Sequence, residues 1–309
     1  MKRITMAAAL AALFVGVSTA QAETYAVLVG INQYPAVLDK DGKPMKDDKG
    51  NVINPNLSGA VNDIKTYNDL LVNKFGVKPA NIKALYDKDA GEAGFIGAMK
   101  WALETAKPGD QVVFAYSGHG GQIEDKKEED GLQEVIVLAD DKLVPGSLFG
   151  DLARNLMQAG ISSTLIFDSC FSGGMSRDVF SFDGKPGQAR VKYLDVKMTS
   201  RMTKVPDAKI GELKAIQKQG LTQSADYAFL FAGAEDQTTT DLDFKDPAKP
   251  DRGLFSLVFG GILEELPEAP LEECIDAIKK LLKEKGFKQV PGFEFSSPER
   301  GKKPLLKKQ

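Results

Sequence analysis

The stretch QVVFAYSGHGG, Gln111–Gly121, joins an apolar run to a glycine-rich turn. The run ends at Tyr116 and is followed at once by SGHG, whose His119 is the only histidine of the 309-residue chain. A short apolar run bounded by glycine is typical of a buried strand. A histidine directly after such a strand is either a structural residue of the turn or part of a site at the edge of a sheet.

The chain on both sides of this stretch alternates between strand-like and helix-like segments. Apolar runs predict strands over residues 25–31, 82–86, 111–116, 134–138, 163–167 and 227–232. Apolar residues at helical spacing predict helices over residues 60–74, 95–106, 148–158, 255–263 and 271–284. Strands that alternate with helices imply an α/β fold, in which a mostly parallel sheet of about six strands is covered by helices on both faces.

Two segments interrupt this alternation. Residues 36–56 are polar, but an EF-hand loop starting at Asp39 would need a glutamate where Gly50 stands, so we interpret the segment as a hairpin or surface loop. Residues 172–226 run without strong periodicity, and a loop of that length is usually functional or mobile. With no repeat or linker in the sequence, we expect one domain over residues 23–309 with these two insertions.

The first residues have the pattern of an export signal. Lys2 and Arg3 precede an apolar core at residues 7–17, and Ala20-Gln21-Ala22 is a small-x-small cleavage pattern. The apolar core is too short to span a bilayer. We therefore expect residues 1–22 to be removed and the mature protein to be periplasmic or secreted; the alternative is an uncleaved N-terminal anchor.

Charge and composition limit the partners. The formal net charge is −3, so there is no general basic field to attract nucleic acid. We expect no membrane contact after cleavage of the leader, and a monomer. One histidine and two scattered cysteines do not build a typical zinc site, so no metal or other cofactor is predicted.

The two cysteines have different surroundings. Cys170 follows the strand predicted at 163–167, as His119 follows the strand at 111–116. Cys274 lies on the apolar face of the helix predicted at 271–284 and is interpreted as a small core residue. A disulfide between them is therefore not expected.

If the two strands are neighbours, the imidazole of His119 and the thiol of Cys170 project from the same edge of the sheet. That pair suits nucleophilic catalysis, because a nearby imidazole lowers the pKa of a thiol or takes its proton, and can then protonate a leaving amine. The backbone amides of Gly120 and Cys170 are candidates to stabilise an oxyanion. The alternatives are a structural histidine and a buried thiol at the end of a strand.

Five stretches in order make this arrangement specific: YAVLVGINQY, GAVNDIKTYNDLL, FAYSGHGGQ, EEDGLQEVIVLADD and LIFDSCFSGG. Together they resemble the peptidase domain of caspase-like cysteine peptidases (peptidase C14 type), in particular bacterial relatives of metacaspases, from about Glu23 to Leu282. The histidine of caspases lies about 50 residues before the cysteine, and His119 and Cys170 match. The resemblance implies a caspase-like α/β/α sandwich, with His119 as base and Cys170 as nucleophile. The sequence around Cys170, DSCFS, is the metacaspase-like form rather than the caspase form.

The same resemblance implies a substrate pocket for arginine or lysine. Its residues are the Asp two positions before the nucleophile, the Ser two before the histidine and an Asp early in the first helix, which match Asp168, Ser117 and Asp63. A pair of carboxylates can hold a guanidinium group in a bidentate manner. The alternatives are a role in starting the helix for Asp63 and a turn carboxylate bound by backbone amides for Asp168. Ala60 stands where the family often has a cysteine.

A second departure concerns calcium, which activates many metacaspases. Gln133 stands where an Asp is usual, and Phe149-Gly150 stands where an Asp pair is expected. Asp130 and Asp140-Asp141 remain acidic but do not form a convincing cage, and residues 128–130 are better read as a solvated loop. Calcium activation is therefore doubted.

The resulting expectation is an exported cysteine endopeptidase that cuts peptide or protein substrates after Arg or Lys and processes itself within residues 172–226. This segment contains ten basic residues, among them Arg177, Arg190, Lys192, Arg201 and Lys204. It can be cut, can occupy the cleft and restrain activity, or can be a stable insertion. Two other functions stay open: a catalytically silent scaffold that binds peptide or a protein partner, and a cysteine-dependent acyltransferase or ligase.

Overall fold

The structure, a computed structural model, describes residues 22–306 apart from residues 48, 127, 129–130, 171–188, 197–200, 217–224, 235–236 and 247. The predicted leader, except Ala22, lies outside these residues, as do Asp130 and Arg177. No helix within the described ranges is long and apolar enough to cross a membrane.

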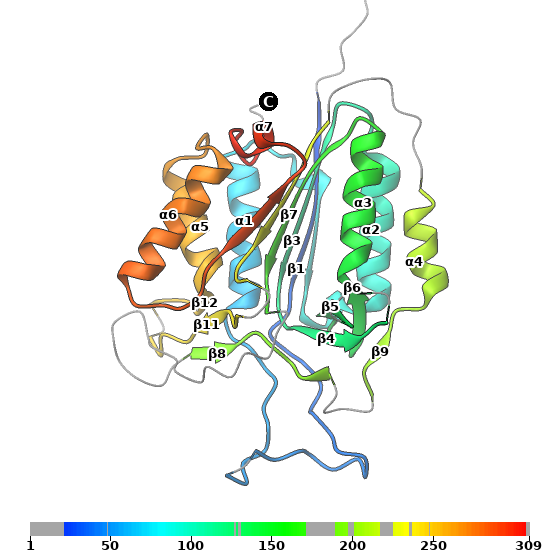
Figure 1. Cartoon of the computed structure of the whole chain (residues 1–309), viewed down its shortest axis with the longest axis vertical. Coiled ribbons are helices and arrows are strands. Elements are labelled where there is room, and N and C mark those ends of the chain that lie inside the picture. The colour runs from blue at the N-terminus through cyan, green and yellow to red at the C-terminus, as the bar shows by residue number, and fades with distance from the viewer. Residues whose placement is uncertain are drawn as a thin grey trace, which may run out of the picture.

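A six-stranded sheet forms the centre of the molecule, in the order β13-β10-β7-β3-β1-β2 (Figure 1). Five strands run parallel and only β13 is antiparallel to its neighbour β10. The strands are β1 (Thr24–Gly30), β2 (Ile82–Tyr86), β3 (Gln111–Ser117), β7 (Ser162–Asp168), β10 (Tyr227–Phe231) and β13 (Gly292–Phe295). The predicted α/β fold with a mostly parallel six-stranded sheet is confirmed.

Helices cover both faces of this sheet because its strands are apolar on both sides. In β1, Ala26 and Leu28 pack among α1 (Ala60–Asn73), α5 (Leu254–Glu265) and α6 (Leu271–Glu284). Val27 and Val29, which point the other way, pack among α2 (Glu92–Thr105) and α3 (Gly146–Gln158). Figure 1 shows these two layers, with α4 (Asp207–Lys214) outside α2 and α3. Short helices complete the fold: η1 (Pro79–Asn81), η2 (Asp87–Ala90) and α7 (Pro298–Gly301).

The strand predicted at 134–138 does not belong to the central sheet. It forms β5 (Leu132–Val137) of a separate sheet, with β4 (Gly120–Glu124), β6 (Lys142–Pro145) and β9 (Thr203–Lys204). The chain turns back after β5 through Asp141, whose φ of 61° is left-handed, and pairs β6 antiparallel to β5. The central sheet takes β13 as its sixth strand instead. The sequence did not indicate β13 because it has only four residues and lies at an edge.

The two insertions contain local structure. In residues 36–56, antiparallel bridges join Leu38 to Pro44 and Lys46 to Val52. In residues 172–226, the described parts form β8 (Ala189–Val191), β9 and α4. Strand β8 joins a three-stranded sheet with β11 (Thr240–Leu242) and β12 (Arg252–Gly253). This small sheet lies beyond the carboxyl ends of β3 and β7, beside the candidate site (Figure 1).

Candidate active site

The ends of β3 and β7 bring the two predicted motifs together. The strands are parallel neighbours, and Ser117 lies opposite Asp168 in their register. His119 and Cys170 each follow these paired residues by two positions and therefore lie at the same edge of the sheet. Both are buried, with exposed fractions of 3% and 0%.

The imidazole of His119 is held by the carbonyl of Pro55 and by the ring of Tyr34. Its Nε2 lies 2.6 Å from the carbonyl oxygen of Pro55, and since a carbonyl only accepts, Nε2 carries the hydrogen. The ring rests against Tyr34, whose hydroxyl accepts a 2.8 Å hydrogen bond from the backbone nitrogen of His119. Nδ1 is buried without a hydrogen-bond partner among the described residues. The basic nitrogen of the ring is therefore Nδ1.

Burial sets the protonation states of the imidazole and the thiol. Desolvation lowers the pKa of His119 to about 4, against the opposing effect of the carbonyls of Pro55 and Lys192. Burial likewise raises the pKa of Cys170 to about 11. The sulfur accepts a 2.6 Å hydrogen bond from the backbone nitrogen of Thr239, and the hydroxyl of Thr239 lies 3.1 Å away. At neutral pH the folded protein therefore holds a neutral imidazole and a neutral thiol.

The amides predicted as oxyanion donors converge on one oxygen. The backbone nitrogens of Gly120 and Cys170 donate to the carbonyl oxygen of Lys192, at 3.0 and 3.1 Å. Lys192 follows β8, and its own nitrogen donates to the carbonyl of Thr239 at 3.2 Å. A peptide carbonyl of the chain itself thus occupies the position where two amides meet beside the thiol.

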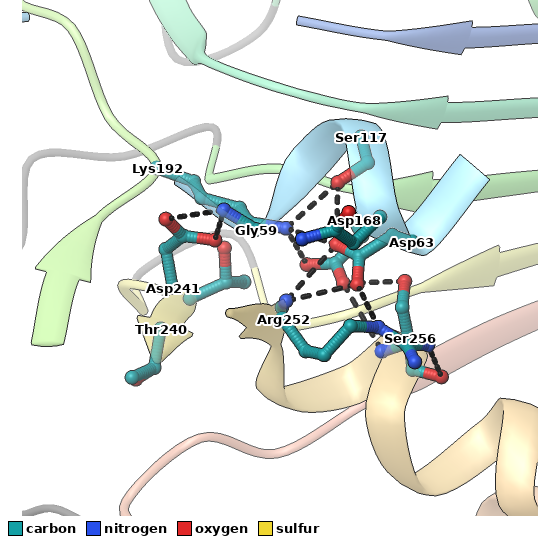
Figure 2. A network of polar contacts seen from close by, with 12 residues as sticks. Gly59, Asp63, Ser117, Asp168, Lys192, Thr240, Asp241, Arg252 and Ser256 are labelled. Atoms are coloured by element: carbon teal, nitrogen blue, oxygen red, sulfur yellow. Dashed lines mark hydrogen bonds and ion pairs between the residues drawn. The ribbon is translucent and has the colours of Figure 1, made fainter. Parts of the chain in front are cut away.

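The three residues predicted to form the substrate pocket surround the ammonium group of this same lysine (Figure 2). The Nζ atom of Lys192 lies 3.1 Å from Asp63, 2.8 Å from Ser117 and 3.0 Å from Asp168. Lys192 is completely buried, and so are its three partners. The three carboxylates of Asp168, Asp63 and Asp241 raise the pKa of Lys192 above its usual value despite its burial, so the ammonium stays charged.

Sequence reasoning did not identify the other residues of this cluster. Arg252 donates from Nε to Asp63 at 2.9 Å, and Ser256 donates to Asp168 from both its backbone nitrogen and its hydroxyl, at 3.1 and 2.6 Å. Asp241 accepts from the backbone nitrogen of Ser58 at 2.8 Å. These residues lie in a part of the sequence without a recognisable motif. The position of Arg252 just before an apolar helix was the only available signal.

The carboxylates of the pocket have partners beyond those that the alternative interpretations named. Asp63 lies in the first turn of α1, where a negative charge suits the helix dipole, and its carboxylate also accepts from the backbone nitrogen of Gly253 at 2.9 Å. Asp168 accepts one backbone amide, that of Ser256, together with the ammonium of Lys192. Burial and the charge of Asp63 raise the pKa of Asp168, while Lys192 opposes this shift.

The acidic positions considered for calcium have partners within the protein. Asp140 accepts the first amide of α2, from Glu92, at 2.9 Å, and Asp141 pairs with Arg201 at 3.0 Å. Gln133 donates to the hydroxyl of Ser147, and Phe149 is buried in the core. Within the described ranges no group of three or more His, Cys, Asp or Glu side chains has the arrangement of a metal site.

Cys274 is separate from the site. It lies on the buried face of α6, where burial raises its pKa to about 11, and both cysteines are free thiols.

Comparison with known proteins gives one family. The family profile described as "Metacaspase, peptidase C14 domain" matches residues 25–178. The chain is 28% identical to Metacaspase-1A of Aspergillus oryzae over 274 residues, which cover 78% of this chain and 64% of that protein. It is 25% identical to Metacaspase-1 of Schizosaccharomyces pombe over 315 residues, which cover 91% of this chain and 69% of that protein. The chain thus spans about two thirds of the length of these relatives.

A solved structure supports the fold. The crystal structure of protein GSU0716 from Geobacter sulfurreducens superposes with a TM-score of 0.59 and covers 92% of this chain and 98% of that one. The sequence identity is 20%, so the likeness concerns the fold alone. Together with the family profile it confirms the resemblance stated from the motifs.

Proposed function

Because the chain belongs to the caspase-like metacaspases of peptidase family C14, we propose that it is a cysteine endopeptidase that cuts after lysine or arginine. One observation carries this proposal. A lysine side chain fills the pocket of Asp63, Ser117 and Asp168 while the carbonyl of that same lysine accepts the amides of Gly120 and Cys170. A substrate residue before a scissile bond has to make the same two sets of contacts.

The charge of the pocket supports a basic residue at this position. Three carboxylates, Asp63, Asp168 and Asp241, face only two cations, Lys192 and Arg252, among the described residues of the cluster. Without the lysine, two negative charges remain uncompensated in a buried site. Unpaired buried charges are costly, so the pocket favours a guest that brings an ammonium or guanidinium group.

In the proposed mechanism His119 Nδ1 takes the proton of Cys170, and the thiolate attacks the carbonyl carbon of the substrate. The amides of Gly120 and Cys170 stabilise the oxyanion, and each such donor contributes about 2.7–4 kcal/mol in known enzymes. The imidazolium then protonates the leaving amine, and water releases the acyl group from the sulfur. Pro55 keeps the ring in the tautomer that this sequence of steps needs.

Export completes the proposal. A leader over residues 1–22 would deliver the enzyme to the periplasm or the medium, where a mature chain starting at Glu23 acts as a monomer on peptide or protein substrates. Sequencing the N-terminus of the protein from each cell fraction tests this part independently of activity.

Hydrolysis of fluorogenic peptides that end in Arg, Lys or Asp tests the reaction. Wild type is expected to cleave the Arg and Lys peptides, Cys170→Ala to cleave none, and Cys274→Ser, the matched thiol control, to behave as wild type. A preference for the Asp peptide would overturn the pocket assignment, and turnover by folded Cys170→Ala would overturn the mechanism.

A silent scaffold is the second candidate, and the complete burial of Cys170 and Lys192 favours it. A permanently filled site binds no substrate. This candidate predicts no hydrolysis by wild type or by any variant that empties the pocket. An acyltransferase on the same site predicts, instead, transfer of the acyl group to an added amine.

A further inference from the structure

A cavity of about 740 Å³ lies beside α3, and the mechanism proposed above does not use it. Its walls come from α3, β5, β7, β10 and β13. Asp63, Ser117 and Asp168 do not line it, so it is separate from the substrate pocket. Its volume is in the range of sites that hold a small organic molecule.

One wall of the cavity is aromatic. Phe167, Phe229 and Phe231 form a group of nearly parallel rings, whose centroids lie 5.9–6.3 Å apart and whose planes differ by 8–17°. Tyr227 packs edge-on at 5.7 Å from Phe229. Phe231 and Tyr227 are only half-buried, so the wall offers ring surface to the cavity. Such a surface binds apolar and aromatic groups, and the faces of the rings attract cations.

A glycine on the edge strand keeps this wall open. In the antiparallel register of β10 and β13, Gly292 lies opposite Phe231 and Glu294 lies opposite Phe229. Residues opposite each other on neighbouring strands share one face of the sheet, so a side chain at position 292 would stand beside Phe231. A Cβ atom at Gly292 would meet no atom within 4 Å. The space in front of the aromatic wall is therefore free at this position.

Carboxylates outnumber cations around the cavity. Among the described residues that line it, Glu128, Glu134 and Glu294 are acidic and Arg154 is the one cation. The guanidinium of Arg154 is itself paired with the carboxylate of Asp151. The hydroxyl of Tyr227 donates to Glu294 at 3.2 Å, so a carboxylate lies at the edge of the aromatic wall. This charge distribution favours a positively charged guest over an anion.

The cavity is a neighbour of the candidate active site. Gly233 lines the cavity, and a Cβ atom there would lie 3.0 Å from Cγ2 of Thr239. The backbone nitrogen of Thr239 in turn donates to the sulfur of Cys170. The two sites are thus close, but because they have different linings, substitutions can distinguish binding in one from binding in the other.

We propose that this cavity is a second binding site, for a small molecule that joins an aromatic ring to an ammonium group. The ring packs against Phe231 and Tyr227, and the ammonium group faces the carboxylates of Glu134 and Glu294. A neutral aromatic molecule would use only the wall, and a small ammonium ion only the charges. The inference goes beyond the peptidase function and does not depend on it.

The first experiment tests the preference for a cation by fluorescence titration of Cys170→Ala, which lacks any chemistry at the thiol. The probes are dansylcadaverine and dansylglycine, which share a fluorophore but carry an ammonium group and a carboxylate, respectively. Dansylcadaverine is expected to bind about tenfold more tightly than dansylglycine. Equal binding of the two probes, or binding of neither, would overturn the proposal.

The second experiment tests the location, again in the Cys170→Ala background. Gly292→Leu places a side chain beside Phe231 and is expected to weaken the binding of dansylcadaverine about tenfold or more, because it fills the space that the ring needs. Gly211→Leu, at an equally open position of α4, is the matched control and is expected to bind as the parent does. Unchanged binding by Gly292→Leu would mean that the probe lies elsewhere and would overturn the site.

A pair of charge substitutions supports the same test if Gly292→Leu fails to fold, which circular dichroism shows. Glu134→Gln/Glu294→Gln is expected to weaken the binding of dansylcadaverine about tenfold without weakening that of dansylglycine. Glu265→Gln/Glu284→Gln, on α5 and α6, is the matched control. Equal effects of the two double variants would contradict the role of the carboxylates.

Asp168→Asn separates this site from the substrate pocket, because the alkylammonium group of dansylcadaverine resembles a lysine side chain. It is expected to bind the probe as the parent does. If Asp168→Asn loses binding while Glu134→Gln/Glu294→Gln retains it, the ammonium group lies in the substrate pocket; that result would overturn the second site and leave the proposed function standing.

Discussion

The backbone nitrogen of Cys170 donates a 3.1 Å hydrogen bond to the carbonyl oxygen of Lys192. The side chain of Lys192 reaches, in turn, the carboxylate of Asp168, two residues before that cysteine. Lys192 thus contacts both the candidate nucleophile, through its carbonyl, and the candidate pocket, through its ammonium group. Cys170 follows β7 and Lys192 follows β8, 22 positions later in the chain, so the two residues meet only in the folded protein.

Asp168→Asn should weaken cleavage after Arg and Lys far more than it changes the thiol. A buried guanidinium or ammonium that loses its charged partner costs a few kcal/mol, so kcat/KM is expected to fall by about 10²–10³-fold. Alkylation of Cys170 by iodoacetamide should change little. Asp151→Asn, on the surface of α3, is the control; equal losses in both variants would contradict the pocket.

Gly253→Ala should close the pocket. A Cβ atom at Gly253 would lie closer than 3.0 Å to carboxylate oxygens of Asp63 and Asp168 and to Nζ of Lys192. Overpacking of this kind costs about 1–3 kcal/mol, and kcat/KM for Arg peptides is expected to fall by about tenfold or more. Gly261→Ala, in α5 with no atom near the new Cβ, should keep full activity. An active Gly253→Ala protein would show that the guest ammonium lies elsewhere.

Acid should destabilise the fold partly through His119. Its pKa of about 4 in the folded protein lies below the ordinary value of 6.5, so the unfolded chain binds this proton more readily. The free energy of unfolding therefore falls as pH is lowered from 6.5 to about 4, by on the order of 3 kcal/mol. Urea denaturation at several pH values compares Cys170→Ala with Cys170→Ala/His119→Gln, which keeps both chains whole. A double variant with the same pH dependence would exclude His119 as the source.

Removal of calcium should leave the activity unchanged. Asp140 and Asp141 are engaged by the amide of Glu92 and by Arg201, so they offer no free carboxylates in the arrangement described. The hydrolysis of an Arg peptide is measured in EGTA and in added CaCl₂. Activation by calcium at a saturable concentration would contradict this expectation.

Cys274→Ser should keep the activity and lose stability. The thiol is buried in α6, and a hydroxyl group transferred there without a good partner costs about 1–3 kcal/mol. A thermal melt gives the loss of stability, and the peptide assay gives the activity. A loss of activity as large as that of Cys170→Ala would mean that the wrong thiol was chosen.

The local apolar pattern was sufficient to predict the two strands that precede His119 and Cys170. Each follows an apolar run, and neighbouring parallel strands present their carboxyl ends at one edge. The apolar pattern did not show which of the predicted strands belong to the central sheet. The run at 134–138 is as apolar as a central strand, yet β5 pairs with β4 and β6, because pairing depends on the turn at Asp141 and on which edges are free.

By itself the sequence determined the α/β fold and the strand ends that carry His119 and Cys170, because the periodicity of these elements is local. The ordered motifs indicated the family, and the resemblance implied the roles of Asp63 and Ser117. Only the tertiary structure decided what fills the site. Lys192 lies in an insertion without periodicity, and its place depends on β8 pairing with β11, some fifty residues later in the chain. The buried charges of Asp63, Asp168 and Asp241 favour a cation. Which cation reaches them depends on the pairing of strands far apart in the sequence, and the local spacing of residues does not predict that pairing.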